Sequence, residues 1–193
     1  MEKQTPEFTR RQLLALVLLV EGGMGVLAVV LGPLLGLPAG DWIRIEWLEV
    51  GVGLGGAAGL VGFLLFLWHF PVGPWGRLRR YAQNTLRPMF QSCRARDLLV
   101  VAILAGVGEE LFFRGLVQGA LARWWGDGAG LCVASILFGL AHCLTREYAI
   151  LATLMGLLLG WLVLVTGNLA AAIIVHAVYD YAALLLLVRG GRR

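Results

Sequence analysis

The chain has 193 residues, of which 59% are hydrophobic and only 15% carry a formal charge, and its mean hydropathy is +0.80. These values lie far outside the usage of soluble globular domains, so they exclude that class and predict an integral membrane protein. The net charge of +4 does not indicate a nucleic-acid partner, because no nucleic-acid-binding motif accompanies it.

Six apolar windows follow one another along the chain, and each predicts a transmembrane helix. A helix needs roughly 20 residues to cross the hydrocarbon core, and the fourth window, with about 15, is the shortest. The predicted fold is therefore all-α, a polytopic membrane bundle of about six transmembrane helices in a single domain that comprises residues 1–193. The windows are 13–36, 47–69, 98–123, 130–144, 148–166 and 169–188.

The basic residues predict the orientation of these helices. With the N-terminus in the cytosol, only Arg44 and Arg123 fall on the outer side and only Arg114 lies within a span, so the positive-inside rule predicts that both termini are cytosolic. The segment 71–97 is predicted to lie at the membrane surface against anionic lipid. The residues assigned to the cytosolic side are Lys3, Arg10, Arg11, Arg77, Arg79, Arg80, Arg87, Arg94, Arg96, Arg146, Arg189, Arg192 and Arg193.

The first two windows carry no motif of their own. Gly51, Gly55 and Gly59 recur at every fourth position of the second window, which lines one helix face with small groups and predicts close approach of a neighbouring helix. Glu21 is an ionisable residue in the middle of the first window, and the sequence assigns it no role.

Two adjacent glutamates, Glu109 and Glu110, and Arg114 interrupt the third window. A charged side chain at the bilayer centre costs roughly 2.5–3.5 kcal/mol on insertion scales, so such residues indicate a functional site. Glu110 and Arg114 share a helix face and are predicted to pair. Glu109 projects about 100° away and has no such partner in its own helix, which makes it a candidate general base. The alternative is a structural Glu–Arg pair beside a protonated or snorkelling Glu109.

Histidines occur in the fourth and the last window, in Phe138-x-x-x-His142 and His176-x-x-x-Asp180. Four-residue spacing places the His176 imidazole and the Asp180 carboxylate on one helix face, so Asp180 can orient the ring. Glu109 and His176 each lie about 12 residues, or roughly 18 Å, from the cytosolic end of their helices and are predicted to meet at one depth. His142 falls at a shallower depth, which predicts a tilted or displaced fourth helix or a different helix end.

Together with Glu109-Glu110-x-x-x-Arg114, these two motifs resemble the CPBP family of intramembrane proteases, which includes the type II CAAX prenyl endopeptidases and the bacterial Abi proteins. The resemblance covers about 98–188 as the catalytic core. It implies an endopeptidase that hydrolyses a peptide bond near the cytosolic side of the membrane. Asp180 stands where the prenyl endopeptidases often carry Asn, and it is the variant common among bacterial members. We expect a multi-pass protein of a bacterial inner (cytoplasmic) membrane.

The resemblance also implies a role for each motif residue. Glu109 with His142 would activate the attacking water, and His176 with Asp180 would position or stabilise the developing oxyanion. It implies catalysis without a cofactor on a peptide or protein substrate, with membrane lipid as the other partner. The supporting residues would be Glu110, Arg114 and Phe138.

Two alternatives remain open at this stage. Zinc could be held by Glu109, His142 and His176 with a fourth position left for water, although the H-E-x-x-H spacing of ordinary zinc peptidases is absent from the sequence. A non-enzymatic membrane protein, such as an immunity or assembly factor, could instead keep the polar cluster for helix packing or partner binding. Loss of the Glu109 carboxylate would abolish an enzyme's turnover and leave such a factor's binding intact.

Overall fold

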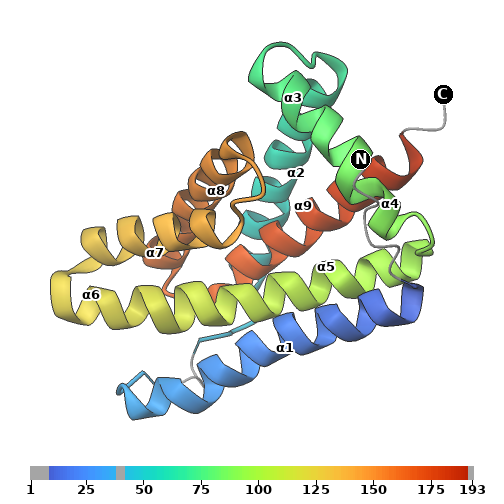
Figure 1. The fold of residues 1–193 in the computed structure, drawn as a ribbon. Coiled ribbons are helices and arrows are strands. Elements are labelled where there is room, and N and C mark those ends of the chain that lie inside the picture. The colour runs from blue at the N-terminus through green and yellow to red at the C-terminus, as the bar shows by residue number, and fades with distance from the viewer. Residues whose placement is uncertain (1–8, 38–41, 191–193) are drawn as a thin grey trace.

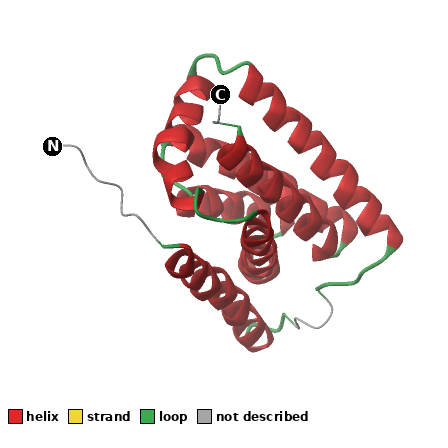
Figure 2. Cartoon of the chain, turned by 90° about the vertical axis from the view of Figure 1, so that its right-hand side faces the viewer, coloured by secondary structure: helices red, strands yellow, loops and turns green. Residues whose placement is uncertain are grey.

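The structure is a computed structural model that describes residues 9–37 and 42–190, and within these ranges every regular element is helical (Figures 1 and 2). The predicted all-α membrane bundle is confirmed. The elements in chain order are α1 (Arg10–Leu34), α2 (Trp47–His69), α3 (Pro74–Tyr81), the π-helical η2 (Ala82–Leu86), α4 (Arg87–Phe90), α5 (Ala95–Glu109), the π-helical η3 (Glu110–Gln118), α6 (Gly119–Trp125), α7 (Asp127–Ala141), α8 (Arg146–Thr166) and α9 (Leu169–Arg189).

Each of the six predicted windows coincides with helix in the structure. Four of the described helices, α1, α2, α8 and α9, are long and apolar enough to cross a membrane. The third window corresponds to α5, η3 and α6, which follow one another without a loop (Figure 1). The fourth window corresponds to α7, an apolar helix of 15 residues. The predicted short fourth helix is therefore present, and it ends at Ala141 rather than at 144.

The ends of the helices agree with the predicted arrangement of the termini. The start of α1 and the end of α9 lie at the same end of the bundle (Figure 1). At that end, the Arg10 side chain pairs with Asp97 at 2.5 Å. At the other end, Arg123 donates to the Gly36 carbonyl at 2.7 Å, and the Arg44 backbone N–H donates to a side chain at the start of α9. Lys3, Arg192 and Arg193 lie outside the described residues.

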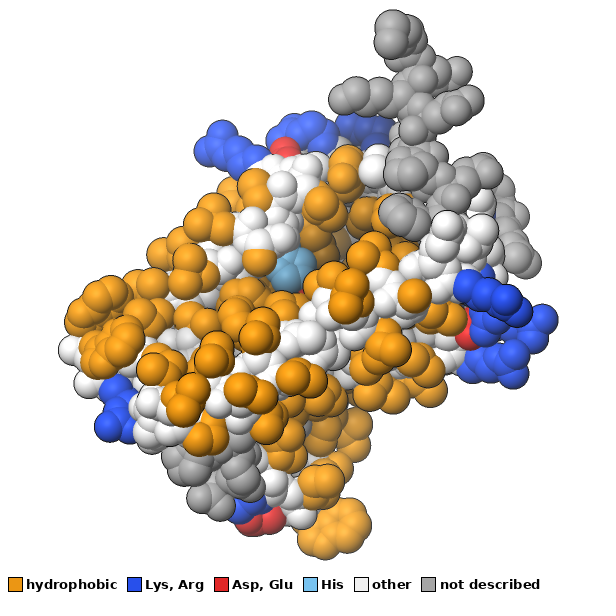
Figure 3. Space-filling model, turned by 60° about the horizontal axis from the view of Figure 1, so that its bottom comes forward, with side chains coloured by type: hydrophobic (Ala, Val, Ile, Leu, Met, Phe, Trp, Pro, Cys, Tyr) orange, Lys and Arg blue, Asp and Glu red, His pale blue; other side chains and the backbone are white. Residues whose placement is uncertain are grey.

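Hydrophobic side chains dominate the outer surface. Figure 3 shows a face on which they form a broad band, with Lys and Arg side chains at its margins and a histidine at the bottom of a hollow. Leucine, valine and phenylalanine side chains of α1 and α2 are exposed along much of their length. Such a surface is stable against lipid and unstable in water, which agrees with membrane insertion of these helices.

The predicted packing face of α2 is wrong. A Cβ atom built on Gly51, Gly55 or Gly59 would have no neighbour within 4 Å, so these glycines face away from the rest of the chain. The face that contacts α9 contains Gly53 and Gly56, which lie against Ile174 and Val175 of that helix and leave no room for a side chain. Small-residue spacing identifies a helix face but not its partner, and α2 has two such faces.

Glycine also brings α1 against α5. A Cβ atom on Gly108 would collide with the backbone carbonyl of Glu21, so the two helices meet here by direct contact of their backbones. Because Gly108 directly precedes Glu109, this contact places Glu21 of the first helix close to the paired glutamates. The fold thereby joins the first span, which contains no motif residue, to the motif-bearing half of the chain.

Replacing Gly108 with valine is expected to lower the melting temperature of the detergent-solubilised protein. The added side chain would meet the Glu21 backbone, which cannot yield unless α1 moves, and overpacking of this kind costs about 1–3 kcal/mol. Circular dichroism during heating measures the effect. Gly62→Val in α2 is the matched control, because a Cβ atom at Gly62 meets nothing within 4 Å. Equal melting temperatures for the two variants would contradict the close α1–α5 contact.

The segment between α2 and α5, which was predicted to lie at the membrane surface, forms three short helical elements, α3, η2 and α4. Arg77 pairs with Glu147 at the start of α8 at 2.6 Å. Arg79 donates to the Trp68 carbonyl at 2.8 Å and places its guanidinium carbon 4.8 Å from the centre of the Trp68 ring. These contacts hold the segment across the end of the bundle at which α8 begins and α2 ends, where it covers the cavity described below.

Candidate active site

The third span changes its hydrogen-bonding pattern at the paired glutamates. Glu109 is the last residue of α5, and Glu110 is the first residue of the π-helical η3. Both side chains are buried, with 6% of Glu109 and none of Glu110 exposed. Single π-helical turns within α-helices occur frequently at functional sites, because they redirect side chains that a regular α-helix would place elsewhere. No feature of the sequence predicts this change.

Glu110 and Arg114 form the predicted ion pair, with 3.0 Å between Arg114 Nη1 and Glu110 Oε1. Both side chains are almost wholly buried, so each charge depends on the other for compensation. The Arg114 guanidinium carbon also lies 4.3 Å from the centre of the Phe138 ring, which adds a cation–π contact between η3 and α7. Phe138 in turn packs edge to face on Phe113 at 5.1 Å. The pair therefore fixes α7 against the third span.

His176 on α9 is held by Glu110 as well as by its predicted partner. Its Nδ1 lies 2.8 Å from Glu110 Oε1, and an N–H at Nδ1 donates to that carboxylate. Its Nε2 faces Asp180 Oδ2 at 3.5 Å and Glu109 Oε2 at 3.9 Å. The shorter contact shows that Glu110 orients the ring more directly than Asp180 does. The sequence predicted the Asp180 contact because it is local, and missed the Glu110 contact because it joins residues 66 positions apart.

His142 lies beside Glu109 although its counted depth placed it closer to the membrane surface. It is the residue that follows the last turn of α7, so the short helix ends at the level of the site. Gly139 permits this placement, because it leaves room for Thr153 of α8 at a distance where a side chain would collide. Of the explanations predicted for the depth of His142, the structure shows a different helix end: α7 ends at Ala141, where it packs tightly on α8.

The hydrogen bonds of His142 determine which ring nitrogen faces the carboxylate. Nδ1 lies 2.9 Å from the Phe138 carbonyl oxygen, an acceptor, so Nδ1 carries a hydrogen. In the neutral ring Nε2 is then an acceptor, and it lies 3.6 Å from Glu109 Oε2. Two acceptors thus face one another, and a water molecule beside them can donate one hydrogen bond to each.

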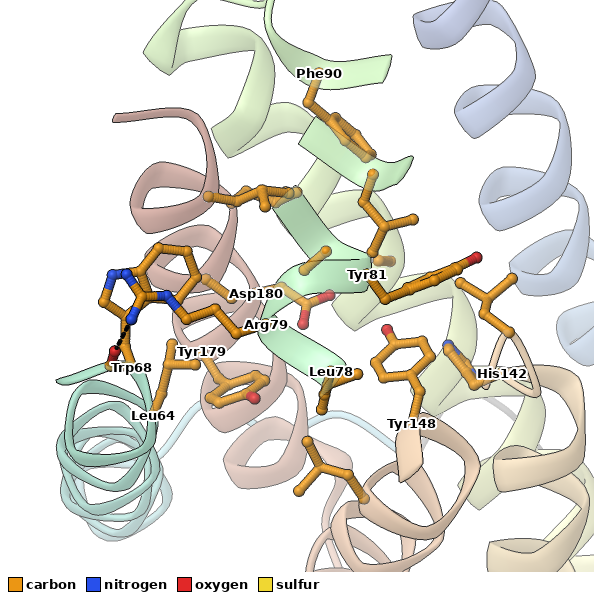
Figure 4. Close-up of a pocket in the computed structure, with 18 of the residues that line it drawn as sticks. Leu64, Trp68, Leu78, Arg79, Tyr81, Phe90, His142, Tyr148, Tyr179 and Asp180 are labelled. Atoms are coloured by element: carbon orange, nitrogen blue, oxygen red, sulfur yellow. Dashed lines mark hydrogen bonds between the residues drawn. The ribbon is translucent and has the colours of Figure 1, made fainter. Parts of the chain in front are cut away.

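These groups open onto a cavity of about 470 Å³. Its wall is mainly apolar and is built by α1, α2, α5, α8, α9 and the α3–α4 segment (Figure 4). Figure 4 shows Tyr148 beside His142 and the Asp180 carboxylate pointing into the same space. A second cavity of about 170 Å³ shares His142 and Asp180 and reaches His176. The motif residues His142 and Asp180 therefore line both cavities.

Three residues line this site that the sequence did not predict to be part of it. Tyr148 of α8 and Tyr179 of α9 line both cavities, and Glu21 of α1 lines the larger one. The tyrosines give no signal in an apolar helix, because a tyrosine near a membrane surface is common. Glu21 did indicate a functional residue, because it is ionisable and lies within a span. The sequence of the chain does not show that it lies near Glu109.

The positions of Glu109, His142 and His176 can be compared with those that a zinc site requires. Glu109 Oε2 lies 3.6 Å and 3.9 Å from the Nε2 atoms of His142 and His176. In the part of the chain that the structure describes, no three His, Cys, Asp or Glu side chains form a group arranged to hold a metal ion. Instead, Asp180 shares His176 Nε2 with Glu109, so one of the two imidazoles already has a carboxylate partner at that nitrogen.

Comparison with known proteins supports the resemblance drawn from the motifs. Residues 92–182 match the family model described as type II CAAX prenyl endopeptidase Rce1-like. The matched segment includes Glu109, His142, His176 and Asp180 and all of η3. No curated protein and no solved structure matches the chain.

Proposed function

Because residues 92–182 match the family model described as type II CAAX prenyl endopeptidase Rce1-like, we propose that the protein hydrolyses a peptide bond within the membrane by activating a water molecule. The observation that carries the proposal is the pair of facing acceptors, Glu109 Oε2 and His142 Nε2, 3.6 Å apart at the wall of a cavity. Amide hydrolysis requires a base for the attacking water, and in this pair two candidate bases face the same position.

In the proposed reaction, water donates its hydrogens to Glu109 and His142 and attacks the carbonyl carbon of the scissile bond. The new C–O bond converts the carbonyl into an oxyanion, and one proton passes from water to Glu109. When the C–N bond breaks, this proton is returned to the leaving nitrogen. The immediate products are a carboxylic acid and an amine. The acid passes its remaining water-derived proton to the amine, which gives a carboxylate and an ammonium group, and the site returns to its starting state.

Stabilisation of the oxyanion is assigned to His176. Its Nδ1 bond to Glu110 fixes the ring, and in the protonated ring the N–H at Nε2 would face Glu109 and Asp180. A donor fixed in place before the reaction stabilises developing charge without the cost of reorientation. Glu110 and Arg114 act as positioning residues, because they hold the ring and the end of α7 and do not reach the cavity.

The proposal is tested by incubating the purified protein in lipid vesicles with a peptide library and with water that contains heavy oxygen. Mass spectrometry then identifies each product. Incorporation of one heavy oxygen into the new carboxyl group of a product is expected, because the attacking oxygen comes from water. Peptide cleavage with no label in the product would contradict direct attack by water, and absence of any cleaved peptide would favour the non-enzymatic alternative.

Chelation of metal ions is expected to leave this activity unchanged. We propose a metal-free reaction in which His142 and His176 act through hydrogen bonds and not as zinc ligands. A chelator should therefore not change the rate. After prolonged incubation with a strong chelator, the rate should remain within about twofold of the untreated rate. Elemental analysis of the active protein measures its metal content. One zinc per chain, lost in parallel with activity, would establish the zinc alternative.

A further inference from the structure

Glu21 is an acid in the first span that the proposed reaction does not use. It lies outside the family-matched segment 92–182 and lines the cavity together with Glu109 and Asp180. A carboxyl group at this depth costs free energy unless it has a partner or a function. Its Oε2 atom is buried, and the residues that the structure describes provide it with no hydrogen-bond partner.

The contact between α1 and α5 determines where this carboxyl group lies. The backbone of Glu21 contacts Gly108, and Gly108 is the residue directly before the base Glu109. Glu109, His142 and Asp180 line the same cavity as Glu21. Glu21 is half-buried, and its side chain is part of the wall of the cavity that also contains Glu109.

The charges around the cavity are unevenly distributed. Three carboxyl groups, those of Glu21, Glu109 and Asp180, line it. Like Glu21 Oε2, Glu109 Oε2 is buried and has no hydrogen-bond partner among the described residues. The arginine in its wall, Arg79, is bound to the backbone and the ring of Trp68 at the α2 end. Arg114 lies behind the wall and is paired with Glu110. Three acidic side chains thus meet at the reacting end of the cavity, and the cationic group that faces two of them, Glu109 and Asp180, is the His176 ring.

We propose that Glu21 determines specificity by binding a cationic side chain of the substrate, a lysine or an arginine close to the scissile bond. Such a side chain combines an apolar stem with a charged head. The stem fits the leucine and phenylalanine side chains of the wall, among them Phe63 and Leu64, and the head reaches the carboxylate of Glu21. In a cavity with low-dielectric walls, the attraction between these charges is stronger than at a protein surface.

This inference rests on the proposed function for its first test, which compares peptides that differ only beside the cleaved bond. The wild-type protein is expected to hydrolyse a lysine peptide about 30-fold faster than its methionine analogue, measured as kcat/KM. Glu21→Gln should reduce this ratio to about one and leave the methionine peptide unaffected, and Glu21→Lys should favour a glutamate peptide. Glu49→Gln, a buried acid of α2 outside the cavity, is the matched control and should keep the wild-type ratio.

Two outcomes of that comparison would overturn the inference. An equal loss for all peptides in Glu21→Gln would assign Glu21 to folding or to catalysis. An unchanged lysine preference would show that the cation is bound elsewhere. Both outcomes leave the proposed peptidase activity standing, so the inference and the proposed function can fail separately.

The second test does not depend on hydrolysis. n-Butylammonium reproduces the end of a lysine side chain, and n-butanol is its neutral analogue. The cation is expected to raise the melting temperature of the wild-type protein and of Glu109→Gln by the same amount, with no shift for Glu21→Gln, whereas n-butanol should give no difference among the three. A shift that survives Glu21→Gln would overturn the inference even if no peptide is cleaved.

Discussion

Glu109→Gln is expected to lower the rate of peptide hydrolysis by about a thousandfold or more, with the fold and membrane insertion intact. The amide keeps the size of the side chain but cannot take a proton from water. Glu109 Oε2 forms no hydrogen bond within the described chain, so the substitution removes no hydrogen bond of that atom. Initial rates with a cleaved peptide and melting curves in detergent measure the two properties.

The matched control for this variant is Glu49→Gln. Glu49 is also a buried glutamate of a membrane helix, with 6% of its surface exposed, but it lines neither of the two cavities at the site. Its loss should leave the rate unchanged. Retained turnover in Glu109→Gln would remove Glu109 from the role of general base. A binding or immunity phenotype that survives Glu109→Gln, in a protein that cleaves no peptide, would support the non-enzymatic interpretation.

Arg114→Ala is expected to destabilise the protein by about 3–5 kcal/mol, because it leaves Glu110 as an unpaired charge in a fully buried position. It also removes the guanidinium that lies over the Phe138 ring. Because Glu110 orients His176, activity should fall together with stability. Thermal unfolding in detergent, followed by circular dichroism, measures the first effect, and peptide hydrolysis below the melting temperature measures the second.

Two further variants make this prediction specific. Arg123→Ala removes an exposed arginine of the same span, which donates to the Gly36 backbone carbonyl, and should have little effect on melting. Arg114→Lys keeps the charge but loses the planar group that both pairs and stacks, so it should recover only part of the lost stability. An unchanged melting profile in Arg114→Ala would show that the pair does not hold α7 against the third span.

The features that the sequence predicted are those set by local spacing. Window length predicted six helical segments, and four-residue spacing predicted that Glu110 meets Arg114 and that His176 meets Asp180. Both distances depend on residues one turn apart, which the helix itself brings together. The change to a π-helix at Glu110 did not prevent the first pair from forming.

The features that the sequence did not predict depend on how helices meet. Glu110 reaches His176, and Glu21 reaches the cavity, only because α9 and α1 pack on the third span. The glycine pattern of α2 gave the wrong face for a similar reason, since periodicity describes one helix and packing involves two. The depth of His142 could not be counted from a membrane surface, because α7 does not extend over the full thickness.

The length of α7 has a consequence for how the chain enters a membrane. Fifteen residues of α-helix span roughly 22 Å, less than the roughly 30 Å of hydrocarbon that a segment must cross to insert by itself. The glycines at 139 and 156 bring α7 and α8 into direct contact, Gly139 on Thr153 and Gly156 on Ser135. We therefore expect α7 to be a stable membrane segment only when it is paired with α8, so that the two helices insert together as a hairpin with His142 at its tip.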